Sequence, residues 1–550
     1  MRWLNVGLTV VFVLALAAGL VRVLEHPEPR TLRILAGSEL VGVLGDRSLM
    51  ADLKEQTGIT LQAQYEGTLE GVERIAAEPG TYDLAWFSST EYLEQRLQTT
   101  LPAKPIMTSP VVLGVRRDKA AELGWHDTDD DGVIDERDIT WADIAAATGS
   151  GRLQLAMTDP AKSNSGFAAL TSVATEATRR GPGEELTAAD VTPDVIAGLV
   201  AGQELTGASS GWLGDEFLRW RSEGHTTPLD GMVNYESELL KVRAEERDRT
   251  DDPLEIVYPT SALYADYPLA LLDHTRRSAY DDLVEWLRSD EVQQRISDDT
   301  RRRPAVGDPT TERTFFGHNP LPIDWPRDLP TITALTQTYN ELRRPSRTVY
   351  VLDTSGSMLA NRGPDGMTRI AELRAALRGL AGDDVTVSGR FSRFRAGDDL
   401  TILPYASSVG QPQQFSIPTD PARALTALSA VGIAAGSLPA RGGHSALYSA
   451  LDEAYRMLAG EDDLSDYTTS VVLMTDGGST PGAGESRAAF LKAYAAHYAG
   501  LHVRTHVVLF GAGARDRSQM DAVAHLTGGT VSDASRQSLQ DVFKEIRGYQ

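Results

Sequence analysis

The chain has 550 residues, with 53 Lys and Arg against 77 Asp and Glu, which gives a formal net charge of −24 at pH 7. Such an acidic protein lacks the basic face that binds phosphates, so nucleic acid is excluded as a partner. Hydrophobic residues make up 41% of the chain and charged residues 24%, as in ordinary globular proteins, and the length predicts roughly two to four domains. Because the chain has no Cys, thiol catalysis, disulfides and Cys-ligated metal centres are excluded as well.

The N-terminal residues 1–30 contain an apolar segment. Residues 3–21 have no charged side chain and lie between Arg2 and Arg22. This length is close to the roughly 20 residues that cross a bilayer, whereas the apolar region of a cleaved signal peptide is usually shorter, roughly 7 to 15 residues. We therefore predict an uncleaved signal anchor, a single transmembrane helix in the cell membrane, with the bulk of the chain extracytoplasmic. Arg2 favours a cytoplasmic N-terminus, although Arg22 and Arg30 weaken that charge argument.

Residues 31–325 alternate short apolar segments with stretches of helical composition, which is the pattern of an α/β domain. The predicted strands are Leu32–Ala36, Thr60–Tyr65, Asp83–Phe87, Val111–Arg116 and Leu153–Met157. Hydroxyl residues follow three of these strands, at Ser38, Ser89, Ser163 and Ser165. Ligands of open α/β sheets bind at such carboxyl ends, although the same residue types are also favoured simply as helix N-caps.

Several segments of this region resemble the bacterial extracellular solute-binding proteins of ABC importers. They are Leu32–Leu40, Tyr82–Ser89, Thr158–Gly166, Asn234–Ser237 and Ile256–Pro259. The resemblance implies two α/β lobes, joined by crossover strands, with a cleft for a small solute between them. By the same resemblance we expect the cleft to be lined by Ser38, Ser89, Ser163, Ser165, Tyr235 and Glu236, with Tyr258 close to a crossover.

Residues 127–138 have the pattern of an EF-hand-type calcium loop. Carboxylates stand at positions 1, 3, 5, 9 and 12 of the loop, and Gly132 stands at the turn position 6. Because Ca²⁺ takes about six to eight oxygens, acids on alternate residues must fold around one point. The predicted ligands are Asp127, Asp129, Asp131, the Val133 carbonyl, Asp135 and Asp138. Asp138 replaces the usual Glu, as in calcium loops of extracellular modules, and an acidic solvated loop is the alternative.

A linker is predicted at 326–346, where Pro-rich sequence and a short helical stretch precede a second α/β domain at 347–550. Strands again alternate with helices, which predicts a doubly wound, mainly parallel sheet. The predicted strands are Thr348–Leu352, Leu400–Pro404, Ser470–Thr475 and Arg504–Phe510. The predicted helices are Thr368–Leu380, Ala446–Leu458, Arg487–Ala499 and Leu539–Ile546.

The first strand of this domain ends in an Asp-x-Ser-x-Ser turn at Asp353–Ser357. This turn, with Gly442–Tyr448 and Val471–Gly478, resembles a von Willebrand factor A domain with a metal-ion-dependent adhesion site. The resemblance implies a Rossmann-like fold and a site for Mg²⁺, or Mn²⁺, at Asp353, Ser355, Ser357, Ser445 and Asp476. Ser445 stands where the family has Thr. Neutral hydroxyls would satisfy a hard cation without cancelling its charge, so that a carboxylate of another molecule could bind to it. A domain that has lost its metal is the alternative.

No enzymatic activity is predicted. The stretch Gly207–Gly211 fits the G-x-S-x-G pattern of α/β-hydrolases, but that pattern needs a preceding strand, and Leu199–Thr206 reads as the end of a helix. We therefore do not expect Ser209 to be a catalytic nucleophile.

The leading hypothesis is a membrane-anchored extracytoplasmic binding protein, in which a metal-dependent adhesion site binds a protein or surface ligand and a solute-binding-like module accompanies it. The first alternative is the substrate-binding component of an ABC importer. The second, an assembly factor working with an AAA+ ATPase, is disfavoured by an outward orientation, because ATP is intracellular.

Overall fold

The computed structural model describes residues 30–125, 127, 133–134, 139–178, 185–207, 209–223, 229–247, 252–305, 316–360, 366–385, 389, 392–440, 443–477, 479–480, 482, 484–510, 513–534 and 539–548. The predicted signal anchor therefore lies outside the described residues, apart from Arg30. Within those ranges no helix is long and apolar enough to cross a membrane. The chain forms two compact units, of which the first comprises Met1–Pro110, Tyr235–Lys241 and Tyr264–His318, and the second comprises the rest.

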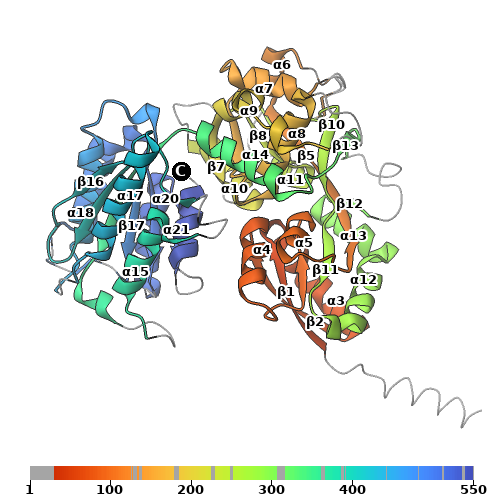
Figure 1. Ribbon diagram of the computed structural model, residues 1–550, viewed down its shortest axis with the longest axis horizontal. Helices are drawn as coiled ribbons and strands as arrows, with labels where there is room; N and C mark the ends of the chain where they lie inside the picture. The colour runs from red at the N-terminus through yellow and green to blue at the C-terminus, as the bar shows by residue number, and fades with distance from the viewer. Residues whose placement is uncertain are drawn as a thin grey trace, which may run out of the picture. The chain divides into compact units, whose positions relative to one another are not determined.

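The first unit is built on a five-stranded sheet with the order β2-β1-β3-β11-β4 (Figure 1). Strand β1 pairs in parallel with β2 from Arg30↔Ile59 to Gly37↔Glu66, so that both strands end at the same edge. The strands are β1 (Arg30–Gly37), β2 (Ile59–Glu66), β3 (Leu84–Trp86), β4 (Ala103–Pro105) and β11 (Pro268–Leu271). The helical segments are η1 (Ser38–Leu40), α2 (Val41–Leu44), α3 (Arg47–Thr57), α4 (Thr68–Ala77), α5 (Glu91–Leu97), η3 (His274–Arg276), α12 (Arg277–Leu287) and α13 (Asp290–Thr300).

Helix α3 shows how local sequence sets these elements. The Asp46 side chain accepts hydrogen bonds from the amides of Ser48, at 2.8 Å, and Leu49, at 3.1 Å, and so caps the helix. The helix ends at Gly58, whose φ of 71° is the left-handed conformation that glycine adopts without a steric penalty. Leu49 and Leu53 lie one turn apart and are both buried, which fixes the helix on the sheet.

A sheet of eight strands has the order β13-β10-β5-β8-β6-β7, with β9 and β12 also paired to β5. Strands β6, β7 and β8 are parallel, whereas β5 runs antiparallel to β9 and β10. The strands are β5 (Met107–Arg116), β6 (Leu155–Thr158), β7 (Gln203–Gly207), β8 (Gly231–Tyr235), β9 (Leu254–Val257), β10 (Ser261–Ala265), β12 (Arg303–Pro304) and β13 (Leu321–Ile323). The accompanying helical segments are α6 (Arg117–Leu123), α7 (Trp141–Gly149), α8 (Asn164–Ala177), η2 (Ala188–Asp190), α9 (Pro193–Ala201), α10 (Ser210–Glu223), α11 (Glu236–Arg247) and α14 (Leu329–Leu342).

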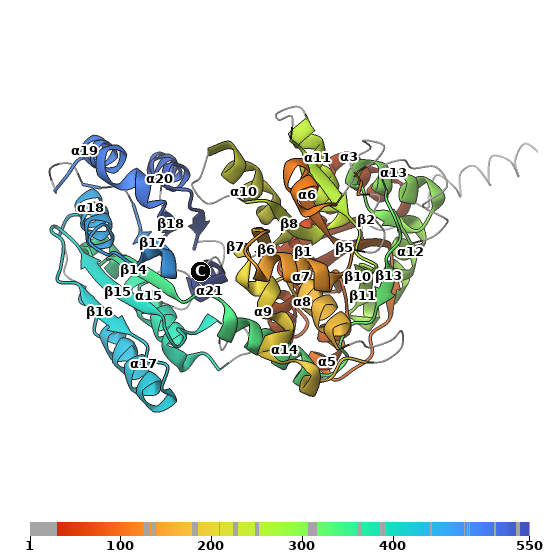
Figure 2. The same ribbon diagram turned by 90° about the horizontal axis from the view of Figure 1, so that it is seen from above.

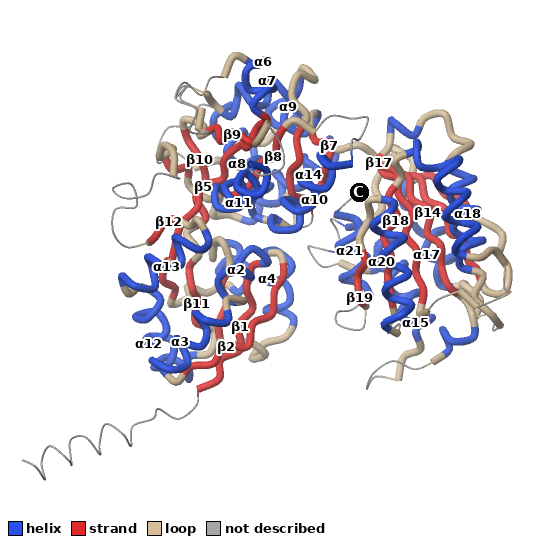
Figure 3. The backbone as a smooth tube through the Cα atoms, turned by 180° about the vertical axis from the view of Figure 1, so that it is seen from behind, coloured by secondary structure: helices blue, strands red, loops and turns tan. Residues whose placement is uncertain are grey.

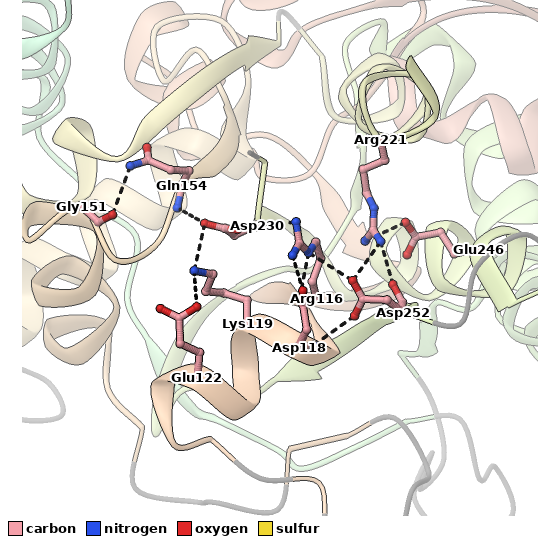
Figure 4. A network of polar contacts seen from close by, with 10 residues as sticks. All are labelled: Arg116, Asp118, Lys119, Glu122, Gly151, Gln154, Arg221, Asp230, Glu246 and Asp252. Atoms are coloured by element: carbon pink, nitrogen blue, oxygen red, sulfur yellow. Dashed lines mark hydrogen bonds and ion pairs between the residues drawn. The ribbon is translucent and has the colours of Figure 1, made fainter. Parts of the chain in front are cut away.

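Figure 4 shows a network of ion pairs that fastens the end of β5 to its neighbours in the second unit. Arg116, the last residue of β5, pairs with Asp118 and, at 3.2 Å, with Asp252. The Asp252 carbonyl accepts a hydrogen bond of 2.7 Å from Arg221, which also pairs with Glu246 at 3.1 Å. Because each of these acids has a basic partner, we interpret the network as a structural clamp.

The C-terminal domain, residues 346–548, has a six-stranded sheet with the order β16-β15-β14-β17-β18-β19. All of its pairs are parallel except β15 with β16. The strands are β14 (Ser346–Asp353), β15 (Asp399–Tyr405), β16 (Gln413–Ser416), β17 (Thr468–Thr475), β18 (Arg504–Leu509) and β19 (Val531–Asp533). The helical segments are η4 (Gly356–Leu359), α15 (Arg369–Arg378), η5 (Gly379–Asp383), α17 (Pro421–Gly436), α18 (Leu447–Leu458), η6 (Leu464–Asp466), α19 (Arg487–Ala493), η7 (Tyr494–Tyr498), η8 (Ala499–Leu501), α20 (Ala514–Thr527) and α21 (Leu539–Gly548).

Helices cover both faces of this sheet, as Figures 2 and 3 show. Along β14, Tyr350 and Leu352 pack into one core with α15, α17 and α21. The alternate residues Val349 and Val351 pack into a second core with α18, α19 and α20. A strand that is apolar on both sides is typical of a parallel sheet enclosed by helices, so the sequence pattern and the layer order agree.

One local prediction is wrong. The second half of the segment expected to end a helix, Leu199–Thr206, is part of strand β7, and Ser209 lies between that strand and α10. Pairing with β6 decides this, because Leu205 and Gly207 lie in register with Ala156 and Thr158 and are buried. The strand that the hydrolase pattern requires is therefore present directly before Ser209.

Candidate metal and solute sites

The predicted metal residues of the C-terminal domain come together at the carboxyl edge of its sheet. Asp353 is the last residue of β14, and Asp476 directly follows β17. These two strands are parallel neighbours, with Leu352 in register with Met474, so both Asp residues emerge at one edge. Ser355 and Ser357 lie at the start of η4 on the same edge. The edge therefore gathers hydroxyl and carboxylate oxygens from segments far apart in the sequence.

Four of the five predicted metal ligands form one hydrogen-bonded chain. The Asp353 carboxylate is fully buried and accepts the Ser355 amide at 2.8 Å and the Tyr405 hydroxyl at 3.3 Å. The hydroxyls of Ser355 and Ser357 lie 3.0 Å apart, and Ser357 donates to Asp476 Oδ1 at 2.9 Å. Burial raises the pKa of Asp353, and the nearby Asp476 carboxylate raises it further. A cation at this edge would relieve that repulsion.

Ser445, the fifth predicted ligand, has a buried hydroxyl that forms no hydrogen bond of normal geometry with the described residues, although it lies close enough to the Tyr405 hydroxyl to oppose the rise in pKa that burial causes there. Its backbone is held firmly, because the amide donates to Thr480 Oγ1 at 3.1 Å and the carbonyl accepts the Thr480 amide at 2.9 Å. A buried hydroxyl without a partner is unfavourable unless a ligand completes it. The donor set of three hydroxyls and two carboxylates fits a hard divalent cation such as Mg²⁺. Among the described residues no group of three or more acidic or His side chains could hold a metal, so this edge differs from an all-carboxylate cage.

Arg369 is a residue of this edge that sequence reasoning missed. It is the first residue of α15, and its Nη1 donates to Asp476 Oδ2 at 2.6 Å. The metal motif is defined by residues that supply oxygen ligands, so nothing in it pointed to a positively charged side chain. The only signal available was an Arg placed at a helix start shortly after the Asp-x-Ser-x-Ser turn.

In the first unit, two of the expected solute ligands are already used by the protein. Ser89 contacts Glu91 and accepts its amide at 3.2 Å, a local turn directly before α5, whose N-cap residue is Thr90. Glu236 is fully buried in a bidentate pair with Arg303, with Oε2 2.7 Å from Nε and Oε1 2.6 Å from Nη2. Both of its carboxylate oxygens are thus engaged by Arg303, and a role of Glu236 in solute binding stays a prediction. Ser38 is partly buried at the start of η1, directly after β1.

In the second unit, Ser163 and Ser165 form a buried hydroxyl cluster at the start of α8. Ser210 Oγ lies 3.2 Å from Ser163 Oγ and 2.9 Å from Ser165 Oγ, and Ser165 also contacts Thr158 Oγ1 at 2.9 Å. The loop before α8 is shaped by Asp159, whose carboxylate accepts the Ala161 amide at 2.9 Å and pairs with Arg343 at 3.3 Å. Tyr258 follows β9 and is buried. Ser210 and Arg343 were not predicted, because only the fold brings them to this loop.

Comparisons with known proteins define both parts of the chain. Residues 32–299 match the family model of bacterial extracellular solute-binding proteins, and residues 348–479 match that of the von Willebrand factor type A domain. The chain joins a solute-binding domain to a von Willebrand factor A domain. A search of curated proteins finds no significant match to it.

Solved structures similar to this chain include several binding proteins. Iron-bound HitA from Pseudomonas aeruginosa has a TM-score of 0.40 and 15% identity, covering 57% of this chain and 99% of that chain. The sulfate-binding protein SubI from Mycobacterium tuberculosis has a TM-score of 0.36 and 17% identity, covering 50% of this chain and 87% of that chain. A periplasmic thiamin binding protein has a TM-score of 0.41 and 12% identity, covering 58% of this chain and 97% of that chain.

The solute-binding domain holds a further buried polar cluster in the first unit, around Glu39. The Arg302 guanidinium donates to the Glu39 carbonyl at 2.8 Å, pairs with Glu238 at 3.2 Å and lies 5.4 Å from the ring centroid of Tyr267. The rings of Tyr267 and Tyr235 are 5.9 Å apart. Tyr267 has a φ of 41°, a strained value for a residue with a side chain. Such strain is concentrated at functional sites, so this cluster is a better candidate for solute contact than Glu236.

Glu39 is expected to make the stability of the solute-binding domain depend on pH. Burial raises its pKa to about 7, while hydrogen bonding to its own amide and the charge of Arg302 only partly offset this effect. A raised pKa favours the protonated folded state, so this contribution is complete below about pH 4.5 and is lost as the pH rises through about 7. The free energy of unfolding of Glu39→Gln, relative to that of the wild type, should therefore increase by up to about 3 kcal/mol between pH 4.5 and pH 8.

This gain can be measured by urea unfolding of wild-type protein and Glu39→Gln at both pH values. Glu55→Gln, at an exposed position of α3, is the matched control and should follow the wild type throughout. Parallel pH profiles for the wild type and Glu39→Gln would contradict the expectation.

The predicted calcium loop lies almost entirely outside the described residues. Asp129, Asp131, Asp135 and Asp138 are not described, whereas Asp127 and Val133 are. Val133 forms a bridge with Ile256, and the Ile134 amide donates to the Ile256 carbonyl at 2.9 Å. The centre of the loop is thus tied to β9, and the calcium site stays a prediction.

Proposed function

We propose that this chain is a membrane-anchored, extracytoplasmic binding protein whose von Willebrand factor A domain binds a protein or surface ligand through a divalent cation. The observation that supports the proposal most directly is the hydrogen-bonded chain formed by Asp353, Ser355, Ser357 and Asp476 at the carboxyl edge of the sheet. A bound Mg²⁺, or Mn²⁺, would act as a Lewis acid toward a carboxylate of the partner. The serine hydroxyls would hold the cation without cancelling its charge, and the two Asp carboxylates would orient its surroundings.

The rest of the chain fits the same role. The apolar segment at 3–21 would anchor the protein in the cell membrane, and Ca²⁺ would stabilise the loop at 127–138. The solute-binding domain would contribute recognition of a small solute rather than catalysis. The second candidate, the substrate-binding component of an ABC importer, is favoured by the match over residues 32–299 and by the buried cluster around Glu39.

Calorimetry with Mg²⁺ tests the metal site. The full-length protein in mild detergent should bind Mg²⁺, and the variant Asp353→Ala, Ser355→Ala should lose this binding because it lacks one carboxylate and one hydroxyl of the edge. The matched control is Asp462→Ala, Ser408→Ala, which removes the same groups at exposed positions of the same domain and should bind normally.

If the wild-type protein took up no Mg²⁺, the adhesion proposal would be lost. Solute capture for an importer would then be the better supported function, and the cluster around Glu39 would be the first place to test it.

A further inference from the structure

Both carboxylate oxygens of Asp476 are occupied by side chains of the protein itself. Ser357 donates to Oδ1 at 2.9 Å, and the Arg369 guanidinium donates to Oδ2 at 2.6 Å. The Asp476 side chain is only 7% exposed and that of Arg369 is 23% exposed, so the pair is partly shielded from solvent. A metal ion that approaches Asp476 therefore encounters the positive charge of the Arg369 guanidinium, which is already bound to this carboxylate.

The position of Arg369 is set by structure around it. Its amide donates to the Ala360 carbonyl at 3.2 Å, directly after η4. Thr368 caps α15 by accepting the Ala371 amide at 3.3 Å, and Ile370 and Leu373 bury the helix in the domain core. The backbone of Arg369 is therefore fixed, and this holds its guanidinium close to Asp476.

Other Arg residues of α15 do not share this arrangement. Arg374 donates to the Leu438 carbonyl at 3.1 Å, and Arg378 lies exposed near Asp383, with a separation of 3.4 Å. Arg369 alone among these three lies against a residue of the metal edge. It brings one positive charge to the place where a divalent cation would bring two, and like charges in a partly buried site repel each other strongly.

We propose that Arg369 is an internal counter-cation: it neutralises Asp476 in the metal-free protein, must withdraw when a divalent cation binds, and so sets the metal affinity of the site. This inference rests on the metal site put forward above and extends it to a residue outside the motif. Arg369 is accordingly a positioning residue, which acts on the cation through Asp476.

The test is a Mg²⁺ titration of four full-length proteins: wild type, Arg369→Gln, Arg369→Lys and the control Arg378→Gln. A partly exposed ion pair is worth on the order of 1 kcal/mol, so Arg369→Gln should bind Mg²⁺ about fivefold more tightly. Arg369→Lys keeps the charge and should stay near the wild type, as should the control. Mg²⁺ binding by Arg369→Gln that is equal to or weaker than that of the wild type would overturn the proposal.

Thermal unfolding gives a second readout that a purely structural ion pair would not produce. With chelator present, Arg369→Gln should melt below the wild type, because Asp476 has lost its partner; with saturating Mg²⁺ the difference should vanish or reverse. An equal loss under both conditions would show a structural role and overturn the proposal. If none of the four proteins bound Mg²⁺, the metal site itself would fail and this role with it, whereas binding by Arg369→Gln alone would support both.

Discussion

Replacing Arg547 with Met is expected to destabilise the von Willebrand factor A domain by about 3 to 5 kcal/mol, the range for breaking a buried ion pair. Arg547 and Asp398 are each 1% exposed and lie 2.6 Å apart. Arg547 also donates to Ser346 Oγ at 2.6 Å and to the Ser392 carbonyl at 3.2 Å. Without the guanidinium, the Asp398 carboxylate would lose its closest positive partner inside the domain.

Hydrogen exchange of peptides from β14 and β15 would measure this loss, because these strands report on the domain core. Adding Asp398→Asn should restore part of the stability, since the side chain becomes neutral. The single amide oxygen can keep only one of the two hydrogen bonds that the carboxylate accepts from the amides of Ser346, at Oδ1, and Arg395, at Oδ2, so the recovery should be incomplete. Arg456→Met is the matched control, because Arg456 pairs with Glu453 on the exposed face of α18, and should cost less than about 0.5 kcal/mol. Equal losses for Arg547→Met and Arg456→Met would contradict the burial argument.

The buried Arg547–Asp398 pair also predicts that the von Willebrand factor A domain loses stability in acid. Burial by itself would raise the pKa of Asp398, but the charges of Arg547 and Arg395 outweigh it and hold the pKa at about 2. A depressed pKa means that this contribution is present above about pH 3.8 and is lost as the pH falls toward 2. In Arg547→Met the loss of stability on acidification should therefore be smaller than in the wild type.

Arg303→Met is expected to have a similar effect on the solute-binding domain, again about 3 to 5 kcal/mol. The two side chains of the Arg303–Glu236 pair are 3% and 0% exposed, and Arg303 also donates to the His318 carbonyl at 3.1 Å. Its guanidinium lies 5.1 Å from the ring centroid of Phe316, where it packs against the aromatic face. Removing it leaves a buried carboxylate without its positive partner.

Urea unfolding followed by circular dichroism should show the change, and Glu236→Gln added to Arg303→Met should recover part of it. The control is Arg277→Met, which breaks an exposed pair with Asp281 on α12 and should cost less than about 0.5 kcal/mol. If Glu236 instead served a solute, Arg303→Met would alter solute affinity more than stability, and a change of affinity without destabilisation would refute the structural role.

The sequence by itself was sufficient to predict many of the strands and helices and the order of the metal-motif residues along the chain. Apolar segments such as Thr348–Leu352 lie inside observed strands, here β14 (Ser346–Asp353), because a strand buried on both faces needs a continuous apolar run. Asp353 and Asp476 could be placed at one edge because parallel strands of a doubly wound sheet end on the same side. These features depend on local periodicity and on the order of strands and helices, and both can be inferred from the amino-acid sequence.

Only the tertiary structure decided how the polar groups are used. Glu236 was expected to bind solute, yet it is neutralised by Arg303, 67 positions away in the sequence. Arg369 reaches Asp476 across 107 positions, and Arg547 reaches Asp398 across 149. Strand β7 exists because β6 pairs with it, although its own sequence resembles a helix end. Ion pairs and sheet pairing join residues through space, and their energy depends on burial and distance, which no local pattern of residues specifies.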